Sequence, residues 1–274
     1  MATRTELRLA EPSEGARSDF PSPTLRHRRD RSSAARRGFL EPMRNRWYLP
    51  CKAAFDRLLA LMLLIPAAPV ILLSALVIKL TSRGPAFYTQ TRVGLHGRPF
   101  TIYKLRTMIH KAESLTGPRW SLPGDPRVTR FGNLLRLTHL DELPQLLNVL
   151  RGDMSLIGPR PERPEFLPEL EKALPGYRKR LSLRPGVTGL AQVQLPADSD
   201  VNSVRRKLAY DLFYIQRLSP WLDLRLMICT LFYAFGVPYE RLGRWFRIPK
   251  LDDVEQAMHP QIHEDSPRPT RRSA

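Results

Sequence analysis

The sequence predicts a helix-rich α+β fold held at a membrane from one side, which makes the chain a monotopic membrane protein. Three observations support this class. An uncharged apolar stretch from Leu58 to Ile78 is long enough to cross a bilayer. Two short segments between residues 82 and 108 have the composition of paired strands. Amphipathic helical patterns occupy much of the chain from residue 134 to residue 235.

The composition indicates an anionic partner. The 274 residues carry 44 Lys and Arg against 26 Asp and Glu, a formal net charge of +18. A charge of this size fits nucleic acid, an acidic membrane or phosphorylated substrates. The two cysteines, Cys51 and Cys229, are too far apart in sequence for a disulfide framework or a zinc motif, so we expect a reducing compartment.

Both ends of the chain are expected to be disordered. Residues 1–46 are rich in Arg, Pro and Ser, without a sustained apolar period. This basic arm lacks the apolar core of a signal peptide. Its charge predicts attraction to anionic phospholipids, although a solvated tail without a specific role explains the composition equally well. Residues 249–274 are expected to form a second disordered tail.

Residues 47–81 are the predicted membrane anchor. Pro66 and Pro69 lie inside the apolar stretch, and each removes a backbone donor. Basic residues flank both ends, so a simple crossing would place one basic flank outside, against the positive-inside tendency. We therefore predict a re-entrant helix-break-helix with both ends in the cytoplasm. A single span with its N-terminus outside is the alternative.

Residues 82–248 are the predicted catalytic domain, and it begins with a hairpin. The segments AFYTQTRV and PFTIYKLRTM flank a turn that runs from Gly94 to Pro99. A period of two places Lys104 and Arg106 on one face of the second strand. Two cations on one face are suited to a diphosphate, whereas a solvated strand edge is the alternative interpretation.

The segment from Leu134 to Phe166 contains the candidate catalytic residues. Thr138 resembles the start of a capped helix, apolar residues then recur at helical spacing, and Gly152 is a reasonable stop. Asp141 and Glu142 therefore lie near a helix N-terminus, which favours their ionised form. Acids beside a basic Gly-Pro-Arg-Pro loop suit phosphoryl chemistry, in which one acid attacks and one holds a metal. The alternative is that both acids only cap a helix.

The remaining elements are mostly helical. A helical segment is predicted after residue 166, followed by a short strand or turn at VTGLAQV. Two amphipathic helices between residues 205 and 235 are separated at Ser219-Pro220, and the second is apolar enough for a membrane interface or for a protein core. The chain contains no Walker loop, dinucleotide fingerprint, zinc spacing or GxSxG elbow.

From about residue 52 to about residue 230 the chain resembles the bacterial sugar transferases, which are monotopic polyprenyl-phosphate phosphoglycosyl transferases. The matching blocks, in chain order, are KxxFD (Lys52 to Asp56), IKLTSRGPAFY, PFTIYKLRTM, LDELPQLLNVLRGDMSLIGPRP, RPGVTGLAQV and DLFYIQRLSPWLDLRLM. The resemblance implies transfer of a phosphosugar from a UDP-sugar to undecaprenyl phosphate with Mg2+, at the cytoplasmic face of a bacterial inner membrane. Such a reaction is the first membrane step of polysaccharide or glycoconjugate synthesis.

The resemblance also implies residue roles. Asp141 would attack the sugar-bearing phosphate, release UMP and hold a phosphosugar-aspartate, and Glu142 would lie at the magnesium. Pro69 matches the family's membrane-break proline. The basic positions that would face phosphates are Lys104, Arg106, Arg136, Arg160 and Arg184.

Four departures from the family pattern leave the acid pair untouched. They are Ala53, Ala68, Leu190 and the run Gln194-Leu195-Pro196. A nucleic-acid binder and a non-catalytic basic membrane scaffold are the rival interpretations. We expect no nucleic-acid partner, because no nucleic-acid motif is present and that class leaves the apolar stretch unexplained. The sugar, the polymer and homo-oligomer formation stay open.

Overall fold

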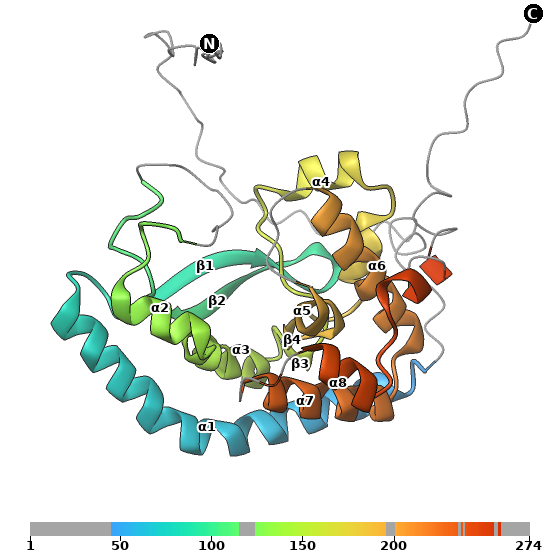
Figure 1. The fold of residues 1–274 in the computed structure, drawn as a ribbon, viewed down its shortest axis with the longest axis horizontal. Helices are drawn as coiled ribbons and strands as arrows, with labels where there is room; N and C mark the ends of the chain where they lie inside the picture. The colour runs from blue at the N-terminus through green and yellow to red at the C-terminus, as the bar shows by residue number, and fades with distance from the viewer. Residues whose placement is uncertain are drawn as a thin grey trace, which may run out of the picture. The chain divides into compact units, whose positions relative to one another are not determined.

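The computed structural model describes residues 45–114, 124–195, 201–234, 237, 239–254 and 257–258. The predicted basic arm lies outside the described residues except for residues 45 and 46. The α-helices are α1 Tyr48–Thr81, α2 Arg130–Leu137, α3 Leu146–Arg151, α4 Leu167–Ala173, α5 Leu190–Gln194, α6 Val201–Arg217, α7 Pro220–Ala234 and α8 Tyr239–Trp245. The strands are β1 Phe87–Val93, β2 Pro99–Leu105, β3 Ser155–Ile157 and β4 Gly186–Thr188, and the 3-10 helices are η2 Leu95–Gly97, η3 Leu140–Gln145 and η4 Tyr177–Ser182. Figure 1 shows this arrangement.

The helix α1 is continuous, so the expected break in helical structure at Pro66 and Pro69 is wrong. The two prolines remove the helical bonds to the carbonyls of Met62 and Ile65, and Figure 1 shows the helix following a curved path. A helix surrounded by lipid has a physical reason to continue, because a break would expose further backbone groups that no water can satisfy. Entry and exit on the same membrane face stay a prediction.

One side of α1 packs on the rest of the protein and the other side is exposed. The buried stripe consists of Ala60, Ala67, Ile71, Ser74 and Ile78, at the spacing of one helix face. Large apolar side chains cover the opposite side, and only 22% of the most apolar 18-residue window is buried. By length and composition α1 could cross a membrane, and its exposed apolar side is consistent with membrane association.

The hairpin is confirmed. The strands β1 and β2 pair antiparallel, with Phe87 opposite Leu105 and Val93 opposite Pro99. The turn between them contains His96 and Gly97 at positive φ, 56° and 78°, a backbone conformation that glycine adopts without steric cost. Lys104 lies near the end of β2. Because β2 packs against η3, the hairpin brings Lys104 to the acid pair.

A second sheet has two short strands, which come from the middle part of the sequence. The strands β3 and β4 pair in parallel, with Ser155 opposite Gly186 and Ile157 opposite Thr188. They carry the two loops that the sequence singled out, Gly158 to Pro161 and Arg184 to Gly186. The predicted short strand or turn at VTGLAQV is therefore β4 followed by α5. The helical segment expected after residue 166 is two shorter pieces, α4 and η4.

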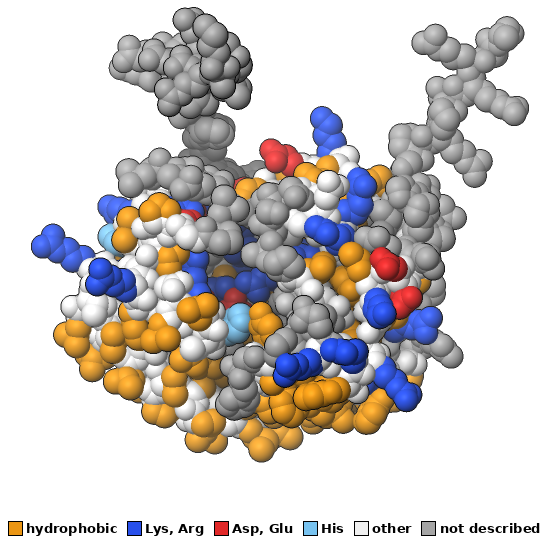
Figure 2. Space-filling model, viewed as in Figure 1, with side chains coloured by type: hydrophobic (Ala, Val, Ile, Leu, Met, Phe, Trp, Pro, Cys, Tyr) orange, Lys and Arg blue, Asp and Glu red, His pale blue; other side chains and the backbone are white. Residues whose placement is uncertain are grey.

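The helices α6 and α7 meet where the sequence predicted, since α7 begins at Pro220. The inner side of α6 supplies the core residues Tyr210 and Tyr214. The outer side of α7 exposes Trp221, Leu231 and other large apolar side chains. Figure 2 shows hydrophobic side chains gathered along the lower edge of that view, where Figure 1 places α1 and α7. This surface is consistent with an interfacial position for α7.

Part of the predicted C-terminal tail, residues 249–274, is described by the structure. Residues 251–254 are helical, and the side chains of Val254 and Met258 are buried. These two apolar side chains pack against the core, so this segment is ordered where the sequence predicted a tail. Residues 259–274 lie outside the described residues.

Candidate active site

The two acids lie in the first turn of the 3-10 helix η3, between α2 and α3. Thr138 does not cap this helix: its hydroxyl donates to the Leu134 carbonyl at the end of α2. The turn is instead made at His139, which has a positive φ of 56°, and the Glu142 amide donates back to the His139 carbonyl. The predicted helix end at Gly152 is confirmed, with φ 83°.

Glu142 is held by two cations. Its Oε1 accepts from Lys104 Nζ at 2.6 Å and from Arg160 Nη2 at 2.9 Å. Burial alone would raise the pKa of Glu142, but the charges of Arg160 and Lys104 and their hydrogen bonds hold it well below its usual range. Glu142 is therefore a fixed carboxylate at working pH, and it also fixes the position of both cations.

Asp141 has a different environment. Its side chain is 8% exposed, and it accepts no hydrogen bond from any part of the chain that the structure describes. Burial raises its pKa, Lys104 opposes that effect, and the neighbouring Glu142 adds to it. Adjacent carboxylates whose environments push their pKa values apart are typical of sites that assign the two acids different roles. Figure 2 shows a hollow in this face, where Lys and Arg side chains surround an acidic one.

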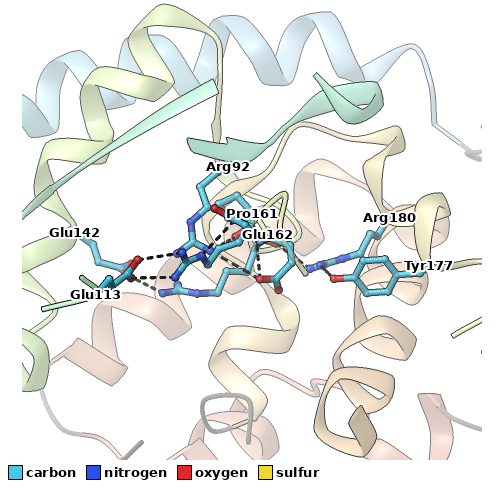
Figure 3. A network of polar contacts seen from close by, with 10 residues as sticks. Arg92, Glu113, Glu142, Pro161, Glu162, Tyr177 and Arg180 are labelled. Atoms are coloured by element: carbon cyan, nitrogen blue, oxygen red, sulfur yellow. Dashed lines mark hydrogen bonds and ion pairs between the residues drawn. The ribbon is translucent and has the colours of Figure 1, made fainter. Parts of the chain in front are cut away.

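Three arginines hold the loop that carries Arg160. Arg92 Nη1 donates to the Pro161 carbonyl at 3.1 Å, and Arg180 Nη2 donates to the Arg160 carbonyl at 2.9 Å. Figure 3 shows Arg92 and Arg180 reaching this segment from opposite sides. Arg163 completes the set through a bidentate contact with Glu113 at 2.9 and 3.1 Å. Guanidinium groups bonded to carbonyls restrict the loop, and Arg160 is thereby presented to Glu142.

Lys104 is positioned by a contact that the sequence did not reveal. Asn148, fully buried in α3, accepts from the Tyr103 amide at 3.2 Å and donates to the Thr101 carbonyl at 2.7 Å. These bonds attach α3 to β2 directly beside Lys104. Asn148 lies among leucines at helical spacing, and a polar residue at such a position is the one signal that could have indicated a buried link.

The structure brings three of the five predicted basic residues to the acid pair. Lys104, Arg136 and Arg160 all act on the charge of Asp141, and Arg136 Nε donates to Thr107 Oγ1 at 2.9 Å. Arg106 and Arg184 lie elsewhere. Arg106 is 6% exposed and donates to the Ser82 carbonyl at 2.9 Å, at the end of α1.

Arg106 and Arg184 therefore do not join the acid cluster. The expected common face of Lys104 and Arg106 ends with β2 at Leu105, and the Arg106 amide pairs with the Ala86 carbonyl outside the strand. Arg184 Nε donates to the Gly152 carbonyl at 2.9 Å. It lines a pocket between α1 and α3 rather than the acid cluster. The alternation of side chains along a strand does not place Arg106 beside Lys104, because Arg106 lies beyond the end of β2 and its side chain bonds to Ser82 at the end of α1.

The acid pair has the donor set for a magnesium ion that also binds substrate phosphates. Both cation contacts of Glu142 fall on Oε1, which leaves Oε2 open, and Asp141 accepts no hydrogen bond within the described residues. Among those residues no cluster of three or more His, Cys, Asp or Glu side chains is present. Magnesium commonly takes one or two carboxylates and completes its shell with water and phosphate oxygens, so the pair fits such an ion.

Comparison with known proteins identifies the family. The family model described as bacterial sugar transferase matches residues 47–236. The chain is a bacterial sugar transferase. The sugar transferase shares 48% identity over 181 residues with the UDP-glucose:undecaprenyl-phosphate glucose-1-phosphate transferase of Caulobacter vibrioides, covering 65% of this chain and 67% of that protein.

Two further relatives of this sugar transferase are longer than the aligned region. The UDP-N-acetylgalactosamine-undecaprenyl-phosphate N-acetylgalactosaminephosphotransferase of Aeromonas hydrophila is 41% identical over 192 residues, covering 69% of this chain and 45% of that protein. The UDP-glucose:undecaprenyl-phosphate glucose-1-phosphate transferase of Escherichia coli K12 is 38% identical over 186 residues, covering 67% and 40%. The names of these relatives contain two different sugars and one acceptor, undecaprenyl phosphate.

Sequence reasoning also missed a buried polar cluster outside the acid pair, which we call the anchor cluster. It joins α1 to α7 and β3, and its ionised members are Lys52, Asp56 and Asp223. Lys52 Nζ lies 2.7 Å from Asp223 Oδ2 and 3.3 Å from Asp56 Oδ2. Tyr48 and Tyr214 donate to Asp223 at 3.0 and 2.6 Å, and Ser155 donates to Asp56. The signal was present in the KxxFD block, where Lys52 and Asp56 are one helical turn apart.

Proposed function

We propose that the chain transfers a phosphosugar from a UDP-sugar to undecaprenyl phosphate through a covalent intermediate on Asp141. The observation that carries this proposal is the contrast within the acid pair. Glu142 is held by Lys104 and Arg160, whereas the Asp141 carboxylate accepts no hydrogen bond within the described residues. An unengaged carboxylate amid three cations is suited to attack an anionic phosphate.

The first step forms a bond between an Asp141 carboxylate oxygen and the phosphorus that bears the sugar. The bond from that phosphorus to the bridging oxygen breaks, and UMP leaves with the electron pair. Lys104, Arg136 and Arg160 neutralise charge on the transferring group and on the departing phosphate. A Mg2+ held by Glu142 would supply further neutralisation of phosphate charge.

The second step returns Asp141 to its starting state. A phosphate oxygen of undecaprenyl phosphate attacks the same phosphorus, the acyl-phosphate bond breaks, and Asp141 leaves as a carboxylate. The lipid diphosphate-linked sugar is the product. Dividing the transfer into two displacements means that the two bulky anionic substrates need not meet in one transition state.

Trapping the intermediate tests this mechanism directly. The purified chain is incubated with UDP-sugar and Mg2+ in the absence of acceptor, quenched in acid and digested. We expect a peptide containing Asp141 that carries one phosphosugar, and its loss on addition of undecaprenyl phosphate. A modified residue other than Asp141, or ternary kinetics without any modified peptide, would contradict the covalent route.

We also propose that both ends of α1 lie on the cytoplasmic face. Arg46 and Arg83 mark the basic flanks of the helix and are exposed. Cysteines placed at these two positions, in a chain whose native cysteines are replaced, should both be protected from an impermeant maleimide added to intact cells. Labelling at residue 46 alone from outside would replace this topology by a single span.

A further inference from the structure

The pocket between α1 and α3 holds an unexplained concentration of positive charge. Its polar lining includes Lys52, Asp56, Arg57 and Arg184 around Gly152. Lys52 lies 2.7 Å from Asp223 and 3.3 Å from Asp56 in the anchor cluster, so these three charges are engaged with one another. Arg57 and Arg184 remain, and neither forms an ion pair with any described residue.

Both arginines converge on the backbone of Gly152. Arg184 Nε donates to the Gly152 carbonyl at 2.9 Å, which leaves its two terminal nitrogens without a bond partner in the described chain. Arg57 Nη2 lies 2.5 Å from the position that a Cβ on Gly152 would occupy. The absence of a side chain at Gly152, whose φ is 83°, is what allows this approach. Arg57 is exposed and Arg184 is partly buried, so two positive charges beside one backbone position attract an anion from the surface.

The position of the pocket indicates where this anion comes from. Arg57 is the last charged residue before the apolar stretch of α1. One helical turn further along the same face, Leu61 is 52% exposed. The other walls of the pocket are apolar and include Leu49, Met154 and Leu183. A ligand with a phosphate for the arginines and acyl chains for the exposed leucines fits both halves of this site.

We propose that this pocket binds the headgroup phosphate of an anionic membrane phospholipid, with Arg57 and Arg184 as its ligands. The lipid is a non-reacting one, because the pocket lies apart from the acid pair. The largest charges acting on Asp141 are Lys104, Glu142, Arg136 and Arg160. The bound headgroup fixes the depth of α1 at the membrane surface. The site does not depend on the proposed reaction, so either can fail alone.

Binding of a short-chain phosphatidylglycerol to the full chain in detergent tests the proposal. The substitution Arg57→Gln should weaken binding about tenfold, as expected for one lost charge-assisted contact to phosphate. The matched control is Arg83→Gln, which removes the same charge from an exposed site at the other end of α1 and should change binding less than twofold. A second variant, Ala53→Leu, fills the pocket without a change in charge and should also weaken binding.

Several outcomes would overturn the proposal. Equal losses for Arg57→Gln and Arg83→Gln would indicate general surface charge. Equal affinity for a short-chain phosphatidylcholine would indicate an apolar pocket. Displacement of the lipid by inorganic phosphate at similar concentration would indicate a free anion site. Displacement by undecaprenyl phosphate at lower concentration than any phospholipid would assign the pocket to the acceptor substrate.

Discussion

Asp141 and Glu142 are adjacent in sequence, yet their surroundings prepare them for different chemistry. Glu142 is bonded to Lys104 and Arg160, and Asp141 keeps its carboxylate unengaged within the described residues. Position in the chain cannot produce this difference, because both acids share the first turn of η3. The difference comes from Lys104 in β2 and Arg160 in the loop after β3, whose hydrogen bonds both go to Glu142 although their charges also act on Asp141.

The ion pair between Lys104 and Glu142 should contribute strongly to stability. The substitution Lys104→Gln leaves Glu142, whose side chain is 16% exposed, with Arg160 alone. We expect the free energy of unfolding to fall by about 3 kcal/mol, the lower end for breaking a buried pair, and transferase activity to fall with it. Denaturant unfolding measures the change. The control Lys111→Gln removes an exposed lysine, and equal stability of the two variants would contradict this role of the pair.

Cys229 should be unreactive in the folded chain. Burial raises the pKa of its thiol to about 11, and its side chain is fully buried. Alkylation requires the thiolate, and a raised pKa lowers the thiolate fraction at any pH below it. We therefore expect slow modification of Cys229 by iodoacetamide at pH 8, faster modification as the pH approaches 11, and rapid modification after unfolding. Mass spectrometry of the peptide measures this, and equal rates in folded and unfolded protein would be inconsistent with the structure.

At the scale of elements, the short sheet of β3 and β4 aligns the loops around the site. A Cβ on Gly186 would lie 2.1 Å from the Gly158 amide nitrogen and 2.3 Å from the Thr188 carbonyl oxygen. Backbone atoms at these distances cannot move aside as a flexible side chain can. The close approach of two backbones thus explains the glycine in the RPG block and the one that opens the Gly-Pro-Arg-Pro loop.

The substitution Gly186→Ala should separate these strands. We expect a loss of about 3 kcal/mol in the free energy of unfolding, at the upper end for overpacking, and loss of activity as Arg160 moves. Gly97→Ala is the comparison, because a Cβ there meets no atom within 4 Å. That variant should lose only about 1 kcal/mol, from its positive φ. Similar losses for both variants would show that backbone contact at Gly186 is unimportant.

Local sequence patterns predicted where helices and strands occur better than they predicted whether a helix is interrupted. The hairpin, the end of α3 at Gly152 and the junction at Pro220 follow from turn and helix-stop chemistry, which is local. The break predicted at Pro66 and Pro69 was wrong. Whether a helix continues through a proline depends on the environment around the helix as well as on the lost hydrogen bond, and no local sequence pattern contains that environment. The helix cap predicted at Thr138 was wrong for a similar reason. A threonine hydroxyl can also donate to a preceding backbone carbonyl, and Thr138 donates to Leu134.

At the scale of the whole molecule, the anchor cluster connects the membrane helix to the catalytic domain. Lys52 of α1 contacts Asp223 of α7, and Asp56 accepts from Ser155 of β3. These contacts are far apart in sequence, so spacing alone could not reveal them. The same limit applies to Arg184, since its place in a pocket with residues of α1 depends on contacts that the sequence does not contain.

Removal of Lys52 should loosen this connection. The substitution Lys52→Met leaves Asp56 and Asp223 buried without their cation, and we expect a loss of about 3 to 5 kcal/mol in the free energy of unfolding. Lys79→Met, on the exposed side near the other end of α1, is the matched control and should be nearly neutral. A melting temperature for Lys52→Met as high as that of Lys79→Met would show that the anchor cluster does not stabilise the fold.

The measurement that tests the central claim most directly is UMP release by the detergent-purified chain. The reaction contains Mg2+, undecaprenyl phosphate and a panel of UDP-sugars, with Asp141→Asn in parallel. We predict release by the wild-type chain with at least one donor, its loss when Mg2+ is chelated, and loss of at least a thousandfold in Asp141→Asn, on the order of the cost of removing a covalent nucleophile. Equal release by the wild-type chain and Asp141→Asn would contradict the assignment of Asp141 as the nucleophile.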